Sequence, residues 1–295
     1  MDDPSKIMAM KFLARLEFLM QLTRPSWQPI VTLKMVQLSM NYGHSPMSPL
    51  CFTYYGMLLA RLGSIREGYS YVKIGRKLLD RDGYNEVAGE VITIGTQVRC
   101  FVEPVQSANE FFLQGHAAAM SAGDMNNAVM SSLAYAIGSY WAGTKLQILK
   151  ERFAVLRSLM EKQNNLMLLA HQTPLERSML MLIGTDEREL PDQPNMAGDY
   201  STMLIYFNKM YLTFMFREYE QMMAFAEKYF SYDVNSWSLL YIHTAQAFIG
   251  GLVAFWVSRK SNNHIWAERG CEAKFALKKW AESSEHNFQH KVYLL

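Results

Sequence analysis

The sequence contains few cysteines, and their scarcity excludes several kinds of protein. Only Cys51, Cys100 and Cys271 occur in 295 residues. They are far apart and odd in number, so neither a disulfide framework nor a metal site built on paired cysteines is expected, and each is interpreted as an unpaired structural thiol. The N-terminal stretch MDDPSKIMAM begins acidic and lacks the apolar segment of a signal peptide. The sequence therefore predicts a reducing, cytoplasmic location.

The chain also lacks an excess of one charge. Its formal net charge is +2, and Lys and Arg are scattered among acidic residues instead of forming a stripe that matches a phosphate backbone. We therefore expect no nucleic-acid partner.

Sequence motifs of nucleotide chemistry and of nucleophilic catalysis are missing as well. The sequence has no G-x-x-x-x-G-K-[ST] and no Gly-Lys pair at all, so it lacks the loop that holds phosphates in an ATPase. It has no H-R-D, no D-F-G and no G-x-S-x-G. The chain by itself is therefore predicted not to be an enzyme, with no catalytic and no cofactor-binding residue.

Strand signals are nearly absent, whereas apolar residues recur at spacings of three and four along most of the chain. Asp3 stands where a helix N-cap belongs and Pro4 at the first helical position. Gly43 suits the end of the second predicted helix. Ser48-Pro49 then opens the next helix. These patterns predict an all-α fold of about a dozen helices.

Four stretches share one pattern: an apolar first helix, a short turn and an amphipathic second helix. They are residues 55–79, 96–120, 135–159 and 208–230. Gly63, Pro104 and Gly143 lie in the first three turns. The first three copies are offset by about 41 and 39 residues, near the period of helix-pair repeats. We therefore predict an α-solenoid of antiparallel helix pairs, a tetratricopeptide-like superhelix, because one such pair cannot bury both apolar faces alone.

The predicted array covers residues 1–295 as a single domain, interrupted by an exposed loop near 184–199 (GTDERELPDQPNMAGD). The 21 Met residues are interpreted mainly as core filling, with a Met-rich peptide groove as the alternative. The residues expected to be largely buried between helix layers are Tyr55, Leu58, Leu62, Tyr69, Tyr135, Phe153, Leu156, Tyr211, Phe214 and Phe225.

One group of residues has the types that bind metal. His286 and His290 are four residues apart, so they share a helix face, and Glu282 precedes His286 by one turn. The order is not H-E-x-x-H and no further ligand is evident, so no metal site is expected.

Residues 234–258, VNSWSLLYIHTAQAFIGGLVAFWVS, contain no Asp, Glu, Lys or Arg and are long enough to span a bilayer. Asn235, His243 and Gln246 are among the polar residues that make the first half unfavourable in lipid. A buried helix of the array is therefore favoured over a membrane span.

Several stretches resemble a particular helical region. Residues 33–49 (LKMVQLSMNYGHSPMSP), 54–80, 215–230 (MFREYEQMMAFAEKYF) and 276–295 (ALKKWAESSEHNFQHKVYLL) are similar to the tetratricopeptide-like region of large multidomain signalling ATPases. In that family a kinase-like domain and an AAA/STAND-type ATPase precede the helical region, and GAF or PAS sensors with a histidine kinase or cyclase output follow it. The resemblance covers nearly the whole chain and implies that the chain is part of a larger protein.

The resemblance implies a non-catalytic scaffold or protein-interaction module that couples nucleotide-binding and output domains. Its partners would be other proteins or neighbouring domains of the same chain. Arg217 departs from the family, which often has Gly at this turn, so that turn is expected to close differently. The alternatives are a helical enzyme with a metal or acid/base site, and a membrane-anchored helical protein.

Overall fold

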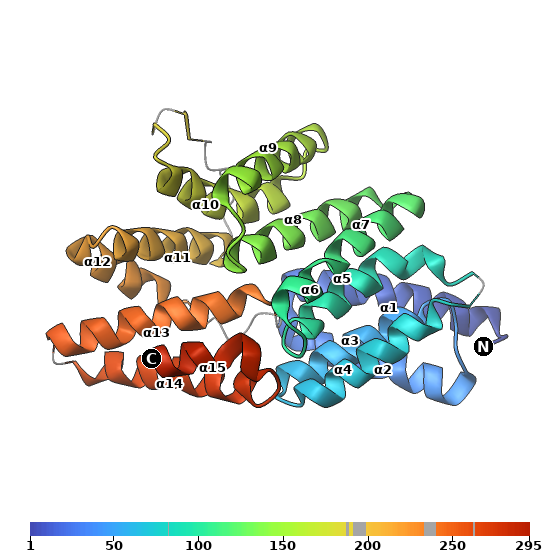
Figure 1. The fold of residues 1–295 in the computed structure, drawn as a ribbon. Helices are drawn as coiled ribbons and strands as arrows, with labels where there is room; N and C mark the ends of the chain where they lie inside the picture. The colour runs from blue at the N-terminus through green and yellow to red at the C-terminus, as the bar shows by residue number, and fades with distance from the viewer. Residues whose placement is uncertain (82, 187–188, 191–198, 233–239, 262) are drawn as a thin grey trace. The chain divides into compact units, whose positions relative to one another are not determined.

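The computed structural model describes residues 1–81, 83–186, 189–190, 199–232, 240–261 and 263–295. These residues form helices α1 to α15 with two short 3-10 turns and contain no strand, which confirms the all-α prediction (Figure 1). Most of the predicted loop at 184–199 lies outside the described residues.

The helices group into two compact units. Unit 1 comprises Met1–Tyr135, Asn235–Tyr241 and Glu282–Asn287, and unit 2 comprises Ala136–Val234, Ile242–Ala281 and Phe288–Leu295. The sequence predicts one array over 1–295, and the packing divides it into these two units. Helices α8 and α15 each contribute residues to both.

Unit 1 is built from consecutive helices that pack on their neighbours. Helix α1 packs on α2, α3 on α4, and α5 on α7, and α3 also contacts α2 and α5. The bounds are α1 Pro4–Thr23, η1 Pro25–Trp27, α2 Gln28–Tyr42, α3 Ser48–Arg61, α4 Ile65–Leu78, η2 Asn85–Val87, α5 Ala88–Arg99, α6 Val105–Asn109, α7 Phe111–Ser121 and α8 Met125–Trp141.

Unit 2 repeats this neighbour packing. Helix α10 contacts both α9 and α11, α11 packs on α12, and α13 packs on α14. The bounds are α9 Leu146–Lys162, α10 Leu166–Ile183, α11 Asp199–Met215, α12 Tyr219–Tyr229, α13 Ile242–Ser261, α14 His264–Ala281 and α15 Glu285–Leu294.

The helix starts and stops follow the sequence signals. The Asp3 side chain accepts the Ser5 N–H at 2.8 Å, and Pro4 is the first residue of α1, as predicted. Gly43 ends α2, which confirms the predicted helix end, but its φ of 81° and ψ of −179° differ from the left-handed helical conformation expected there. Pro104 does not form a simple turn, because it caps the short α6 that precedes α7.

Among the described residues, one turn geometry closes six helices. After α3, the Gly63 N–H donates to Ala60 O at 3.1 Å and the Ser64 N–H donates to Leu59 O at 2.9 Å. This is the Schellman arrangement, in which a residue of positive φ lets two helix-end carbonyls be satisfied. The same pair of bonds recurs around Gly123, Gly143, Asn164, Gly184 and Arg217, all of positive φ.

Arg217 corrects the expectation that its turn would close differently. Its φ is 63°, its N–H donates to Phe214 O, and the Glu218 N–H donates to Thr213 O. The turn therefore has the same hydrogen bonds as the glycine turns. The positive φ of Arg217 costs free energy, because the Arg Cβ is crowded in a left-handed conformation.

The α3–α4 pair contains a close backbone approach. A Cβ built on Gly68 would stand 2.3 Å from Gly56 O, and one built on Gly56 would stand 2.4 Å from Gly68 O. Gly75 is similarly closed in by Pro49 O and the Thr53 hydroxyl. Three glycines thus let the two helices touch along their backbones.

The predicted core is partly correct. Tyr69, Phe153, Leu156 and Tyr211 are buried, and Phe153 is fully so. Tyr55, Leu58, Tyr135, Phe214 and Phe225 are half-buried. The prediction that Leu62 is buried was wrong, because its side chain is 71% exposed. Helix α3 ends at Arg61, so Leu62 lies in the turn with Gly63 and not on the apolar face of the helix.

The apolar run at 234–258 forms α13 from Ile242 onward, while its residues 234–239 lie outside the described part of the chain. Thr244 and Gln246 are buried within the helix packing of unit 2. Among the helices described, none is both long enough and apolar enough to cross a membrane.

Candidate interaction surface

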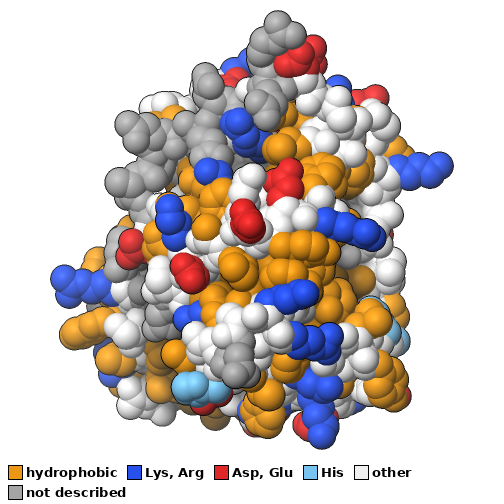
Figure 2. All heavy atoms as spheres, turned by 90° about the vertical axis from the view of Figure 1, so that its left-hand side faces the viewer, with side chains coloured by type: hydrophobic (Ala, Val, Ile, Leu, Met, Phe, Trp, Pro, Cys, Tyr) orange, Lys and Arg blue, Asp and Glu red, His pale blue; other side chains and the backbone are white. Residues whose placement is uncertain are grey.

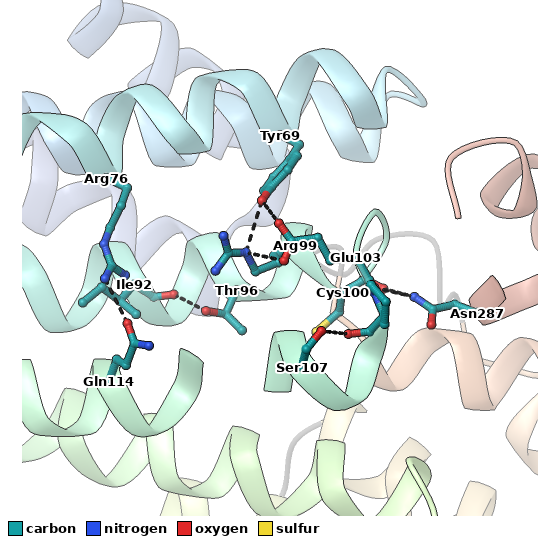
Figure 3. Close-up of polar contacts among 11 residues, drawn as sticks. Tyr69, Arg76, Ile92, Thr96, Arg99, Cys100, Glu103, Ser107, Gln114 and Asn287 are labelled. Atoms are coloured by element: carbon teal, nitrogen blue, oxygen red, sulfur yellow. Dashed lines mark hydrogen bonds and ion pairs between the residues drawn. The ribbon is translucent and has the colours of Figure 1, made fainter. Parts of the chain in front are cut away.

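Side chains from α4, α5 and α7 meet on one surface of unit 1, and Figure 3 shows most of them. We refer to this group as the Arg99 cluster. Its members are Tyr69, Lys73 and Arg76 of α4, Arg99 of α5, Glu103 of the α5–α6 turn, and Phe111 and Gln114 of α7.

Arg99 lies at the centre of the cluster. Its Nε donates to the Tyr69 hydroxyl at 3.2 Å and lies 3.2 Å from Glu103 Oε2. The Tyr69 hydroxyl in turn donates to Glu103 Oε1. The Arg99 guanidinium carbon lies 3.5 Å from the centroid of the Phe111 ring, a cation–π distance. Arg99 therefore links α4, α5 and α7.

A second guanidinium approaches the same ring. Arg76 Cζ lies 5.9 Å from the Phe111 centroid, and Arg76 Nη2 donates to Gln114 Oε1 at 3.0 Å (Figure 3). Lys73 Nζ lies 5.1 Å from the Tyr69 ring centroid. The cluster thus combines three cations with one carboxylate.

The environment perturbs two of these groups. Partial burial, followed by the positive charge of Arg99, lowers the pKa of Arg76. Burial and the hydrogen bond to Glu103 raise the pKa of Tyr69, so the phenol stays protonated and keeps donating. Two guanidiniums near one ring, of which only Arg99 pairs with a carboxylate, favour an incoming anion, because it would balance the remaining positive charge.

Besides the Tyr69 hydroxyl, Figure 3 shows two hydroxyl groups that donate to the backbone. Thr96 Oγ1 donates to Ile92 O at 2.6 Å, and Ser107 Oγ donates to Pro104 O at 2.9 Å. Both bonds fix local helix geometry, as hydroxyls four or three residues after a carbonyl commonly do.

Asn287, the last residue of unit 1, holds the turn that carries Glu103. Its Nδ2 donates to Cys100 O at 3.1 Å and to Glu103 O at 2.7 Å, while its Oδ1 accepts the Val105 N–H at 3.1 Å (Figure 3). A buried amide with three such bonds is well satisfied. It fixes the α5–α6 turn, and with it the position of the Glu103 carboxylate.

Of the three residues considered as metal ligands, His286 and His290 lie four apart on α15, as predicted, whereas the placement of Glu282 was wrong. Glu282 lies in the turn after α14 and not one helical turn before His286, because α15 begins only at Glu285. His286 Nε2 is 3.0 Å from the Ser284 hydroxyl. Over the residues that the structure describes, no group of three His, Cys, Asp or Glu side chains is placed to hold a metal ion.

All three cysteines are free thiols. Burial raises the pKa of Cys51 and of Cys100 to about 12, so both stay protonated at neutral pH and are poor nucleophiles. Cys271 is exposed on α14.

Among the described residues of unit 1, two buried carboxyl groups were missed by sequence reasoning. Glu17 of α1 accepts from Thr32 Oγ1 at 2.9 Å, and Glu90 of α5 accepts from the Tyr54 hydroxyl at 2.6 Å. Burial raises the pKa of Glu17 to about 7 and also raises that of Glu90. The available signal was the position of Glu17 inside the apolar run LEFLMQL. Their role here is in the core of unit 1.

An aromatic surface lies on unit 2, where α11 turns into α12. Tyr219 stacks on Trp256 with centroids 4.4 Å apart, and Lys260 Nζ lies 5.9 Å from the Trp256 centroid. Met215 and Phe216, on the same turn, are about half exposed. Figure 2 shows the side of the molecule with α12, where hydrophobic side chains gather between Lys and Arg.

The sequence pointed to none of the residues of the Arg99 cluster as functional, although it predicted that Tyr69 is buried. They come from three helices and form no local motif, so only the packing brings them together. In comparisons with known proteins, no family model matches this chain, and no curated protein matches it significantly.

Proposed function

We propose that this chain is a non-catalytic helical scaffold and protein-interaction module of a larger, cytoplasmic signal-transduction ATPase. In this proposal the helix pairs form a tetratricopeptide-like solenoid that couples nucleotide-binding and output domains. The resemblance of residues 33–49, 54–80, 215–230 and 276–295 to the helical region of such ATPases supports this context.

The recurring turn supports the repeat architecture. The left-handed residues Gly123, Gly143, Asn164 and Gly184 follow one another at intervals of about 20 residues. A helix closed by the same turn at each interval is what a stack of similar helical units requires. Neighbour packing of α9, α10 and α11 is consistent with such a stack.

The Arg99 cluster is the observation that carries the interaction role. Side chains from α4, α5 and α7 come to one surface here. Arg76 and Arg99 lie near the Phe111 ring, Lys73 lies near the Tyr69 ring, and Arg99 alone pairs with the Glu103 carboxylate. Arg together with aromatic rings is a composition enriched at protein interfaces. The partner that fits is a carboxylate-bearing segment of another protein or of a neighbouring domain.

Charge reversal in the full-length protein tests the surface. Arg76→Glu with Lys73→Glu changes exposed residues of α4, so the fold should persist while coupling of ATP turnover to output falls. Lys77→Glu is the matched control, because Lys77 is exposed on the same helix and makes none of the cluster's contacts. If the double variant and the control behave alike, the Arg99 cluster is not the partner surface.

Calorimetry with ATP on the isolated chain tests the absence of nucleotide chemistry. No binding heat is expected, because the sequence lacks the phosphate-binding loop. ATP turnover by these 295 residues alone would overturn the scaffold proposal and favour an enzyme.

A further inference from the structure

A groove runs between α1 and α2 in unit 1. It has a volume of about 470 Å³ and is lined along about two turns of each helix. The side chains on which its chemistry depends are Lys6, Phe12 and Leu13 of α1 and Lys34, Leu38 and Tyr42 of α2.

The groove is positively charged. Lys6 Nζ lies 5.0 Å from the Tyr42 ring centroid, and Lys34 Nζ donates to Gln37 Oε1 at 3.0 Å. No Asp or Glu lines the groove, and neither lysine forms an ion pair with any residue that the structure describes. The nearby Asp3 carboxylate is used to cap α1. Both cations are therefore available to an acidic ligand.

The walls of the groove continue into exposed apolar side chains. Met8 and Phe12 of α1 are 66% and 67% exposed and lie one helical turn apart. Ile30, Leu33 and Met40 of α2 are at least half exposed. Single exposed apolar residues are common on proteins, but a contiguous group beside a groove marks an interaction surface.

We propose that the α1–α2 groove binds an amphipathic helix of a partner protein, with an apolar stripe flanked by Asp or Glu. A helix fits because two packed helices present ridges and a groove of matching spacing to a third. Lys6 lies beside Tyr42, and Lys34 precedes Tyr42 by about 12 Å along α2. Carboxylates about two turns apart on the partner helix would therefore meet both lysines.

Charge also excludes a second copy of this surface as the occupant. A two-fold contact of the groove with itself would place Lys6 and Lys34 of both copies in one interface. Like charges that face each other at a binding interface disfavour the contact strongly. This inference concerns a different surface from the Arg99 cluster and does not depend on it.

The test uses two synthetic helical peptides of about 18 residues. Both carry Leu at i, i+3, i+4 and i+7 spacing; one has Glu on each side of the stripe and the other has Lys at those positions. Binding to the whole chain is measured by fluorescence anisotropy. The Glu peptide should bind at least about tenfold more tightly than the Lys peptide, and less tightly as salt is added.

Variants locate the binding. Lys6→Glu with Lys34→Glu should weaken binding of the Glu peptide at least about tenfold. Lys77→Glu with Lys150→Glu makes the same change in net charge at exposed positions of α4 and α9, and should leave the affinity nearly unchanged.

Three results would overturn the proposal. They are equal binding of the two peptides, equal loss in both double variants, and a dimer in sedimentation that Phe12→Asp dissociates, which would make a second copy the occupant. None of these results bears on the Arg99 cluster, whose test is the activity of the full-length protein.

Discussion

The α3 and α4 backbones approach closely because Gly56, Gly68 and Gly75 stand at their contact, whereas α1 and α2 contain no glycine and leave a groove. The solvent-facing sides of the two helix pairs also differ. The exposed face of α4 is mainly polar, with Arg66, Ser70 and Lys73, while α1 and α2 expose Met, Phe, Ile and Leu. The two pairs of unit 1 therefore differ in where their apolar residues lie. The α3–α4 pair buries most of them, whereas the α1–α2 pair has apolar residues both in its core and on its exposed face.

The contrast shows how a helical pair can leave a surface for a partner. Where small residues let two backbones touch, the apolar side chains are buried in the contact between the helices and few stay exposed. Where larger residues keep the helices apart, the exposed apolar area can be covered by another helix.

The largest effect is expected from the apolar residues themselves. Leu50 of α3 is 2% exposed, so Leu50→Ala should cost about 2–5 kcal/mol of unfolding free energy through lost burial and a cavity. Phe12→Ala on α1 removes a larger side chain that is mostly exposed, and should change stability by less than about 0.5 kcal/mol. Urea denaturation measures both. Similar losses in the two variants would mean that the outer face of α1 is already packed.

The close approach of α3 and α4 gives the second prediction. Gly68→Ala places a Cβ 2.3 Å from Gly56 O, so it should destabilise by about 2–3 kcal/mol despite the better helix propensity of Ala. Ser70→Ala, on the exposed face of the same helix, is the control and should be nearly neutral. Thermal unfolding distinguishes them, and a stabilised Gly68→Ala would refute the backbone contact.

The α1–α2 pair carries the buried Glu17, which predicts a pH effect. Its carboxyl stays protonated in the folded state to about pH 7, but ionises near its ordinary value of 4.5 when unfolded. The folded state binds more protons between these values, so stability falls as the pH rises through them. Glu17→Gln should therefore stabilise the protein at pH 8 by on the order of 1–2 kcal/mol and flatten its pH profile.

Denaturation curves from pH 4 to 8 provide the measurement for Glu17. Glu151→Gln, at an exposed position of α9, is the control and should keep the wild-type profile. An unchanged profile in Glu17→Gln would assign the pH dependence to Glu90 or to other groups.

The smallest effect concerns the turns. The α3–α4 turn uses Gly63, and the α11–α12 turn has the same bonds with Arg217. Gly63→Ala should cost about 1 kcal/mol, and Arg217→Gly should gain about as much, because only glycine adopts positive φ without crowding. Differential scanning calorimetry resolves shifts of a few degrees. The two variants should change the melting temperature in opposite directions. If both lower it, Arg217 stabilises the fold through contacts of its own.

Local signals in the sequence predicted much of the fold. Asp3, Pro4 and Gly43 marked helix ends correctly because capping depends on neighbouring backbone groups only. The prediction that Leu62 is buried was wrong. Its spacing continues the apolar face of α3, but the helix ends before Leu62, at the turn that contains Gly63. The prediction that the turn at Arg217 closes differently was wrong, because the backbone hydrogen bonds of this turn hold Arg217 at a positive φ that its side chain disfavours.

The candidate surfaces were much less predictable. Arg76, Arg99 and Phe111 lie on three helices, and Asn287 is far from the turn that it holds. No local pattern links such residues, because their meeting depends on how each helix rotates and packs.

Residue types and their spacing within a few turns were enough to predict the helices and their principal ends, and to show that recognisable nucleotide-binding motifs are missing. The packing of the helices sets which apolar faces are covered, which lysines line a groove and which cations share a ring. Those properties depend on distances between helices, and such distances are set by the side chains or glycines at each contact.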